Sequence, residues 1–92
     1  MTLAAPKVEI DHYSHRAYVD GKEVFFTPQE WRALELLEYQ RATTNEELAE
    51  ALFGSTEGEY AQGVRVYISR IRRKLGSTAI TTLRGWGYRF DG

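Results

Sequence analysis

The sequence predicts an α+β fold in which a small N-terminal antiparallel sheet is followed by three helices and a C-terminal β-hairpin. Two patterns support this prediction. Capping motifs and apolar residues at helical spacing divide residues 27–76 into helical segments, and short alternating segments punctuated by glycine lie on both sides of them. The length of 92 residues, with 42% hydrophobic and 27% charged content, is typical of one soluble globular domain.

The N-terminal part of the chain contains strand signals. Residues 1–7 are expected to form a flexible end or linker, and residues 8–92 the folded domain. The dipeptide Asp20-Gly21 predicts a hairpin because both residue types tolerate the turn geometry. Three short strands are expected around this turn and the polar segment that precedes it, at 8–10, 16–19 and 22–26.

Two capping boxes predict the starts of the first two helices. Residues 27–30 form one, with Pro28 at the first helical position, and this helix is expected to end near Gln40. Residues 44–47 form the other, and the shorter helix that follows is expected to end at Gly54. The apolar residues expected on the core side are Trp31, Ala33, Leu34, Leu37, Leu48, Ala51 and Leu52.

The third helix is expected over residues 60–75, with Gly76 as its C-terminal stop. An apolar stripe at helical spacing predicts its buried side, formed by Val64, Ile68, Ile71 and Leu75. The opposite side carries Gln62, Val66, Ser69, Arg70 and Arg73, and the flanks carry Arg65, Tyr67, Arg72 and Lys74. Two strands, at 79–83 and 87–90, should then form a hairpin. Two helices, a basic third helix and a hairpin are the outline of a winged helix-turn-helix.

Charge is divided between two parts of the chain. Residues 1–63 hold 5 Lys/Arg and 12 Asp/Glu, a net charge of −7. Residues 64–92 hold 7 Lys/Arg and 1 Asp, a net charge of +6, so the whole chain has a net charge of −1. A basic segment of this kind favours a polyanion partner.

Several classes of protein and site are disfavoured by composition. The chain has no cysteine, which excludes disulfides and thiolate metal sites and suits a cytoplasmic location. We see no signal peptide and no apolar window long enough to span a membrane. The pair His12 and His15 is expected to be turn surface rather than a metal site. No residue pattern indicates catalysis or a cofactor.

The third helix and the hairpin provide candidate contacts to double-stranded DNA. An exposed arginine near the middle of a helix can contact guanine in the major groove, which selects Arg70, and Val66 on the same face can contact a thymine methyl. Arg84, at the hairpin turn, can enter the minor groove. Residues expected to contact the DNA backbone are Arg65, Tyr67, Ser69, Arg72, Arg73, Lys74, Thr82 and Arg89.

Four segments carry a resemblance to a known family, at 26–37, 45–48, 67–75 and 82–90. Together they resemble the effector domain of OmpR/PhoB-type response regulators, over nearly the whole chain. The resemblance implies a four-stranded N-terminal sheet, a three-helix core and a wing. No receiver domain is expected within these residues, which form either an excised effector domain or a free-standing relative without phosphorylation control. It also implies base contacts by Val66, Arg70 and Arg84, with phosphate contacts by Tyr67, Arg72 and Thr82. By the same resemblance, loop 53–60 would touch RNA polymerase, and two copies would bind direct repeats head-to-tail.

The third helix departs from the family pattern at four positions. The family usually has threonine, aspartate, histidine and arginine where this chain has Gly63, Arg65, Tyr67 and Ser69, respectively. The preferred DNA sequence therefore need not match any known box. The alternative function is a protein-interaction module that uses Tyr67, Trp86 and the acidic loop. Trp86 itself is predicted either to pack on the sheet or to contact DNA.

Overall fold

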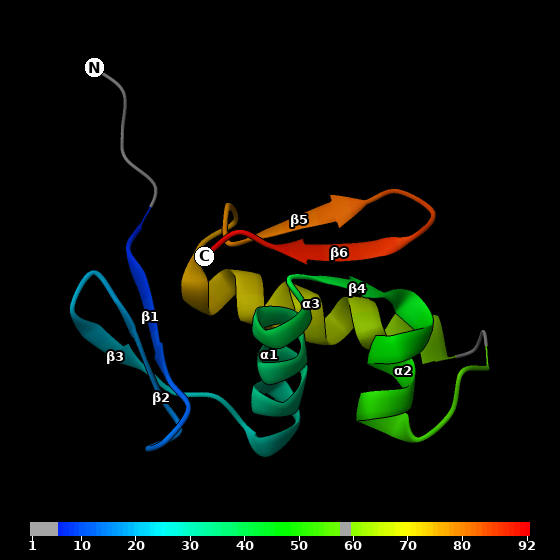
Figure 1. Ribbon diagram of the computed structural model, residues 1–92, viewed down its shortest axis with the longest axis horizontal. Coiled ribbons are helices and arrows are strands. Elements are labelled where there is room, and N and C mark those ends of the chain that lie inside the picture. Colours follow the sequence, from blue (N-terminus) through cyan, green and yellow to red (C-terminus); the bar gives the residue numbers. More distant parts are fainter. Residues whose placement is uncertain (1–5, 58–59) are drawn as a thin grey trace.

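Three helices occupy the centre of the molecule, with one small sheet on either side of them (Figure 1). The computed structural model describes residues 6–57 and 60–92. The helices are α1 (Pro28–Gln40), α2 (Asn45–Phe53) and α3 (Ala61–Leu75). The predicted order of sheet, three helices and hairpin is confirmed. Within the described residues, no helix combines the length and the apolar character needed to cross a bilayer.

The N-terminal sheet is antiparallel, in the order β1-β2-β3. The strands are β1 (Val8–Asp11), β2 (Arg16–Val19) and β3 (Lys22–Val24). The β2–β3 turn is the predicted Asp20-Gly21 hairpin, with φ angles of 51° and 82°. Two expectations need correction within the described residues. The sheet has three strands rather than four, and β3 stops at Val24 because the next residues turn the chain toward the cap of α1.

Both predicted capping boxes are present. At α1, the Glu30 amide donates to Thr27 Oγ1 over 3.2 Å, and the Thr27 amide donates back to Glu30 Oε1 over 2.9 Å. At α2, the Thr44 and Glu47 pair makes the same exchange, with both distances 3.0 Å. These reciprocal bonds satisfy amides that a helix start otherwise leaves without partners.

A short strand, β4 (Ala42–Thr44), was not predicted and connects α1 to α2. It pairs with β6 (Gly87–Phe90), which also pairs with β5 (Ile80–Leu83), so the hairpin belongs to a three-stranded sheet of order β4-β6-β5. Gly87 allows this close pairing, because a Cβ atom there would lie 2.0 Å from the Thr43 carbonyl oxygen. The predicted hairpin is therefore anchored to the helices by its second strand.

The core lies between the three helices and the second sheet. The predicted stripe on α3 is confirmed, since Val64, Ile68, Ile71 and Leu75 are each at most 1% exposed. Trp31 is buried as predicted, whereas on α2 Ala49 rather than Ala51 is buried with Leu48 and Leu52. An ion pair also joins α1 to α3.

That ion pair connects Glu30 Oε1 to Lys74 Nζ over 2.6 Å. The Glu30 side chain is buried and the Lys74 side chain is 33% exposed. Burial acts to raise the pKa of Glu30, but hydrogen bonds from the Lys74 side chain and the Thr27 backbone outweigh it, so the pKa is lowered. The carboxylate is therefore held charged, and it fixes the C-terminal turn of α3 to the start of α1.

Candidate nucleic-acid interface

The outer side of α3 is an exposed basic surface. Its exposed residues include Arg65, Val66, Arg70 and Arg73, and the core stripe lies on the opposite side of the helix. The helix contains no Asp or Glu. In the part of the chain that the structure describes, every ion pair involves other basic residues, so the three α3 arginines named here lack a carboxylate partner. Their charge is available to an external anion.

A groove of about 480 Å³ separates α3 from the wing. We use wing for the β5–β6 hairpin, residues 80–90. The groove brings together Arg65 and Arg72 from the helix and Thr82 and Arg84 from the wing. Asn45, which the sequence did not suggest as a site residue, also lines it. Its position follows from the β4–β6 pairing, which places the start of α2 beside the wing.

Arg72 holds the wing against α3. Its Nε and Nη2 atoms donate to the Ile80 carbonyl oxygen over 3.1 and 2.9 Å, and Nη2 also donates to Thr82 Oγ1 over 2.7 Å. The guanidinium carbon lies 5.8 Å from the centre of the Tyr88 ring. The two predicted phosphate-contacting residues, Arg72 and Thr82, are therefore joined to each other and fix the width of the groove.

The turn of the wing lies beside the start of α2 (Figure 1). Gly85 has a φ of 73°, which a glycine adopts without strain, and the flanking Arg84 and Trp86 are exposed. Of the two predictions for Trp86, the structure leaves the ring 46% exposed rather than packed away on the sheet. The Asn45 amide donates to the Trp86 carbonyl oxygen over 3.1 Å, which fixes the turn against α2.

Two predicted backbone-contacting residues are paired within the protein. Lys74 is engaged by Glu30, and its Nζ atom also lies 5.1 Å from the centre of the Phe26 ring. Arg89 Nε lies 2.8 Å from Asp91 Oδ1. Hydrogen bonds from Arg89 and then Thr81 lower the pKa of Asp91, so this carboxylate stays charged. Neither residue is among those that line the groove between α3 and the wing or the surface around Arg70.

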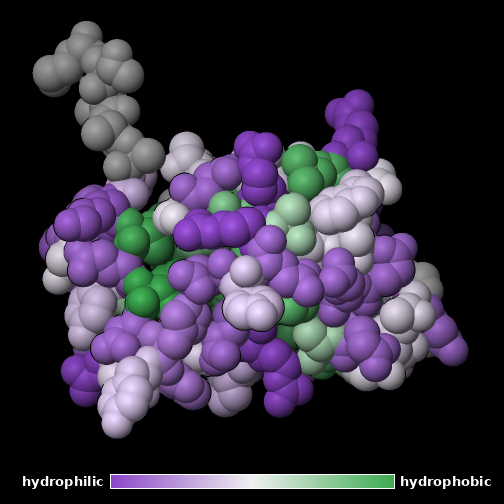
Figure 2. Space-filling view, viewed as in Figure 1, coloured by the Kyte–Doolittle hydropathy of each residue, from purple (hydrophilic) through white to green (hydrophobic). Residues whose placement is uncertain are grey.

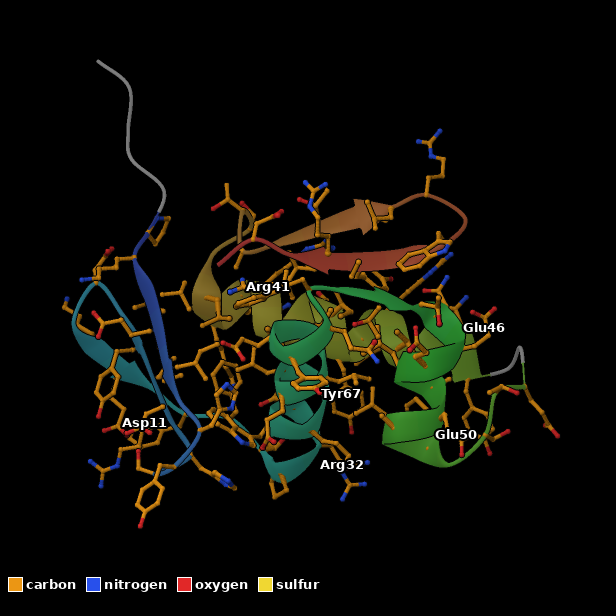
Figure 3. All side chains as sticks on the ribbon, viewed as in Figure 1. Asp11, Arg32, Arg41, Glu46, Glu50 and Tyr67 are labelled. Carbon is orange, nitrogen blue, oxygen red and sulfur yellow. The ribbon has the colours of Figure 1, made fainter. Side chains whose placement is uncertain are left out.

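Negative charge lies on other elements. Figure 3 shows Glu46 and Glu50 on α2, and these residues border a second groove of about 540 Å³ between α1 and α2. Hydrophilic residues cover most of the face shown in Figure 2, and hydrophobic areas are visible beside the N-terminal sheet. The predicted polymerase-contacting loop, 53–60, includes residues 58 and 59, which lie outside the described residues.

The two histidines lie against α1. His12 Nε2 lies 2.7 Å from Glu38 Oε2, and the His15 ring stacks on Trp31 with 5.4 Å between ring centres. Each histidine thus contacts residues of the helix beneath it. This arrangement attaches the β1–β2 turn to α1 on the side away from the wing.

Comparison with known proteins places this architecture in a family. The family described as "Transcriptional regulatory protein, C terminal" matches residues 21–90. The phosphate regulon transcriptional regulatory protein PhoB of Pseudomonas aeruginosa is 35% identical over 87 residues, covering 89% of this chain and 38% of that protein. The two-component response regulator PhoP of the same organism is 35% identical over 95 residues, covering 97% and 42%. The chain therefore spans about two fifths of the length of these relatives.

Solved structures show the same fold. The DNA-binding domain of CpxR from E. coli has a TM-score of 0.77 and 27% identity, covering 98% of this chain and 95% of that one. The RstA DNA-binding domain of Klebsiella pneumoniae, solved in complex with the RstA box, has a TM-score of 0.80 and 26% identity, covering 96% and 94%. The chain belongs to the OmpR/PhoB-type family of response-regulator effector domains, which are winged helix-turn-helix DNA-binding domains of transcriptional regulators.

Proposed function

We propose that this domain binds double-stranded DNA sequence-specifically, with α3 in the major groove and the wing in the adjacent minor groove. One observation carries the proposal: arginines without carboxylate partners, within the described residues, converge from α3 and the wing on one side of the molecule. An α-helix with its side chains is about 10–12 Å wide, and the major groove is about 12 Å wide. The outer side of α3 therefore fits between the two DNA backbones.

Arg70 and Val66 are the proposed base contacts in the major groove. Both are exposed on the outer side of α3, and Val66 is 45% exposed. The Arg70 guanidinium can donate two hydrogen bonds to guanine O6 and N7. The Val66 side chain can contact a thymine methyl group. Arg84 is the proposed minor-groove contact, because it projects from the turn of the wing.

Six further residues, of which Tyr67 and Arg72 are half-buried, are proposed to contact phosphates. They are Arg65, Tyr67, Ser69, Arg72, Arg73 and Thr82. If about three phosphates are neutralised by the three arginines, the slope of log K against log salt concentration is roughly −2.7. Affinity should then fall about 40-fold between 50 and 200 mM salt. The acidic residues on α1 and α2 do not prevent binding, because they lie on other elements.

The relatives extend the proposal to regulation and stoichiometry. PhoB is described as a transcriptional regulatory protein, and the RstA domain was solved in complex with the RstA box. We propose that this chain likewise acts in transcriptional regulation in the cytoplasm and that two copies bind direct repeats head-to-tail. The departures at Gly63, Arg65, Tyr67 and Ser69 lie in α3 itself, so the preferred sequence is expected to be its own.

Selection of bound duplexes from a random pool tests the proposal. We expect a defined motif, with a spacing that reports one or two copies. On the selected duplex, Arg70→Ala should cost about 1–3 kcal/mol and relax the preference at one base pair. Arg32→Ala is the matched control, since Figure 3 shows this exposed arginine on α1 at the end far from the wing. If no motif is selected, or if both variants bind like the wild type, the proposal is wrong.

A second candidate function is a protein-interaction module, as considered above for Tyr67, Trp86 and the acidic loop. The observation in its favour is the groove between α1 and α2, where Leu36 and Ala51 are bordered by Glu46, Glu47 and Glu50. This surface could dock a basic segment of RNA polymerase or of another regulator. A gel shift on random duplexes at low salt separates the two functions. Absence of a shift at micromolar protein would favour the interaction module, because non-specific DNA binding is visible there.

A further inference from the structure

One flank of α3 carries a column of side chains that ends at the proposed base contact. Tyr60, Gly63, Tyr67 and Arg70 follow one another at intervals of three and four residues, so they lie along the same side of the helix. Phe53, the last residue of α2, lies across this column. The column therefore connects the end of α2 to Arg70.

The Phe53 ring contacts two aromatic rings of this column, those of Tyr60 and Tyr67. It stacks on Tyr60, with 5.1 Å between ring centres and an angle of 20°, and it meets Tyr67 at 6.0 Å and 52°. These are favourable geometries for aromatic pairs. Gly63 provides the space, because a Cβ atom there would lie 2.5 Å from Phe53 Cζ. The glycine that departs from the family pattern thus allows Phe53 to support Tyr67.

The Tyr67 ring in turn supports Arg70. The Arg70 guanidinium carbon lies 5.3 Å from the centre of the ring, within the range of a cation–π contact. Within the described residues, Arg70 has no carboxylate or hydrogen-bond partner that would hold its side chain elsewhere. A long exposed arginine otherwise samples many rotamers, and DNA binding must restrict them. The contact with the Tyr67 ring restricts the rotamers of Arg70 before DNA is bound.

We propose that Tyr67 and Phe53 are positioning residues that preset the Arg70 guanidinium for base recognition. This inference rests on the proposed base contact by Arg70. It assigns the Tyr67 ring a role in sequence preference, which is separate from the role of its hydroxyl in contacting a phosphate. Held in advance, Arg70 loses less conformational freedom on binding the correct base pair. The two roles of Tyr67 can be separated, because phenylalanine keeps the ring and leucine removes it.

The test measures base discrimination, defined as the dissociation constant for a duplex changed at the base pair contacted by Arg70, divided by that for the selected duplex. Removal of an exposed cation–π contact should reduce this ratio about two- to fivefold in Tyr67→Leu. Tyr67→Phe should keep the wild-type ratio, although its affinity for both duplexes can fall equally. Phe53→Leu should reduce the ratio by less than Tyr67→Leu, because it removes only the support beneath the ring.

Failure of the positioning role and failure of the proposed function are distinguishable. If Arg70→Ala lowers the ratio but Tyr67→Leu keeps it, the positioning role is overturned while the proposed function stands. If Arg70→Ala leaves the ratio unchanged, the proposed base contact fails, and the positioning role fails with it. A measurement on the unmodified protein covers the case in which Tyr67→Leu does not fold. The Arg70 side-chain NMR signals should be shifted upfield by the ring, and unshifted signals would overturn the proposal.

Discussion

Replacement of Lys74 by methionine should destabilise the domain more than any change to a surface ion pair. The substitution keeps the aliphatic stem of the side chain and removes the ammonium group that lies 2.6 Å from Glu30 Oε1. The Glu30 carboxylate then stays buried, with the Thr27 amide as its remaining described partner. Breaking a fully buried ion pair costs about 3–5 kcal/mol. Because the Lys74 side chain is 33% exposed, water can replace part of the loss, and we expect about 2–3 kcal/mol.

Two further variants isolate the ion pair from the packing. Glu30→Gln removes the buried charge but keeps an oxygen for the Thr27 amide, so it should cost only about 1 kcal/mol. The double variant should be more stable than Lys74→Met alone, because it no longer contains a buried unpaired carboxylate. Lys7→Met is the matched control, since the Lys7 and Glu9 side chains are 78% and 55% exposed, and it should change stability by at most about 0.5 kcal/mol.

The pH dependence of the loss has a defined sign. The pKa of Glu30 is lowered in the folded wild type, so the pair contributes fully above the unfolded-state pKa of about 4.3. That contribution is lost as the pH falls through the lower folded-state pKa. In Lys74→Met, the ammonium no longer lowers the pKa of Glu30, and burial is opposed only by the hydrogen bonds from Thr27, so the pKa is higher than in the wild type. The difference between wild type and variant should therefore be largest at neutral pH and shrink toward pH 3.

Urea unfolding at about pH 7 and pH 3 measures these differences. At pH 7, Lys74→Met should lower the thermal midpoint by about 10–20 °C, given roughly 4–8 °C per kcal/mol for a domain of this size. The reasoning would be refuted by a loss below about 0.5 kcal/mol at pH 7, or by an equal loss at both pH values. Either result would mean that Glu30 is not a buried carboxylate whose charge depends on Lys74.

Three further predictions concern the wing. Gly87→Ala should destabilise the domain by about 3 kcal/mol in urea unfolding, because its Cβ atom would lie 2.0 Å from a backbone oxygen of β4, and a loss below 1 kcal/mol would contradict this close approach. In a Trp31→Phe background, acrylamide should quench the fluorescence of the exposed Trp86 in the free protein, and it should quench less when duplex DNA is bound. Equal quenching in both states would contradict a contact between the wing and DNA. Arg72→Ala should weaken binding to all DNA sequences alike and flatten the salt slope by about one unit. It should also speed amide hydrogen exchange in the wing, and unchanged exchange would contradict the role of the Arg72 hydrogen bonds to the Ile80 carbonyl oxygen.

The parts of the fold that sequence predicted well depend on local interactions. Capping boxes involve residues three apart, and the α3 stripe repeats within one helix, so both can be recognised without knowledge of the fold. Strand β4 was missed because three residues are too few to show an alternating pattern, and its partner β6 lies more than forty residues away along the chain. The position of Asn45 beside the wing was missed for the same reason.

The sequence predicted which basic residues belong to the candidate site, but it did not predict which of them are paired within the protein. Helical spacing placed Arg70 and Arg73 on the side of α3 opposite the core and Arg65 on a flank, and all three are exposed in the structure. Helical spacing did not show that Lys74 forms an ion pair with Glu30, because the two residues are 44 apart in sequence. Partners at such distances depend on tertiary packing, which also determines that Arg72 holds the wing.

The central claim is that α3 enters the major groove while the wing enters the minor groove, and dimethyl sulfate footprinting of the selected duplex tests both parts together. The reagent methylates guanine N7 in the major groove and adenine N3 in the minor groove, where these acceptors are exposed. We expect protection of a guanine that is lost in Arg70→Ala, and protection of an adjacent adenine that is lost in Arg84→Ala. Absence of both protections on a bound duplex, or protections that neither variant changes, would contradict the account.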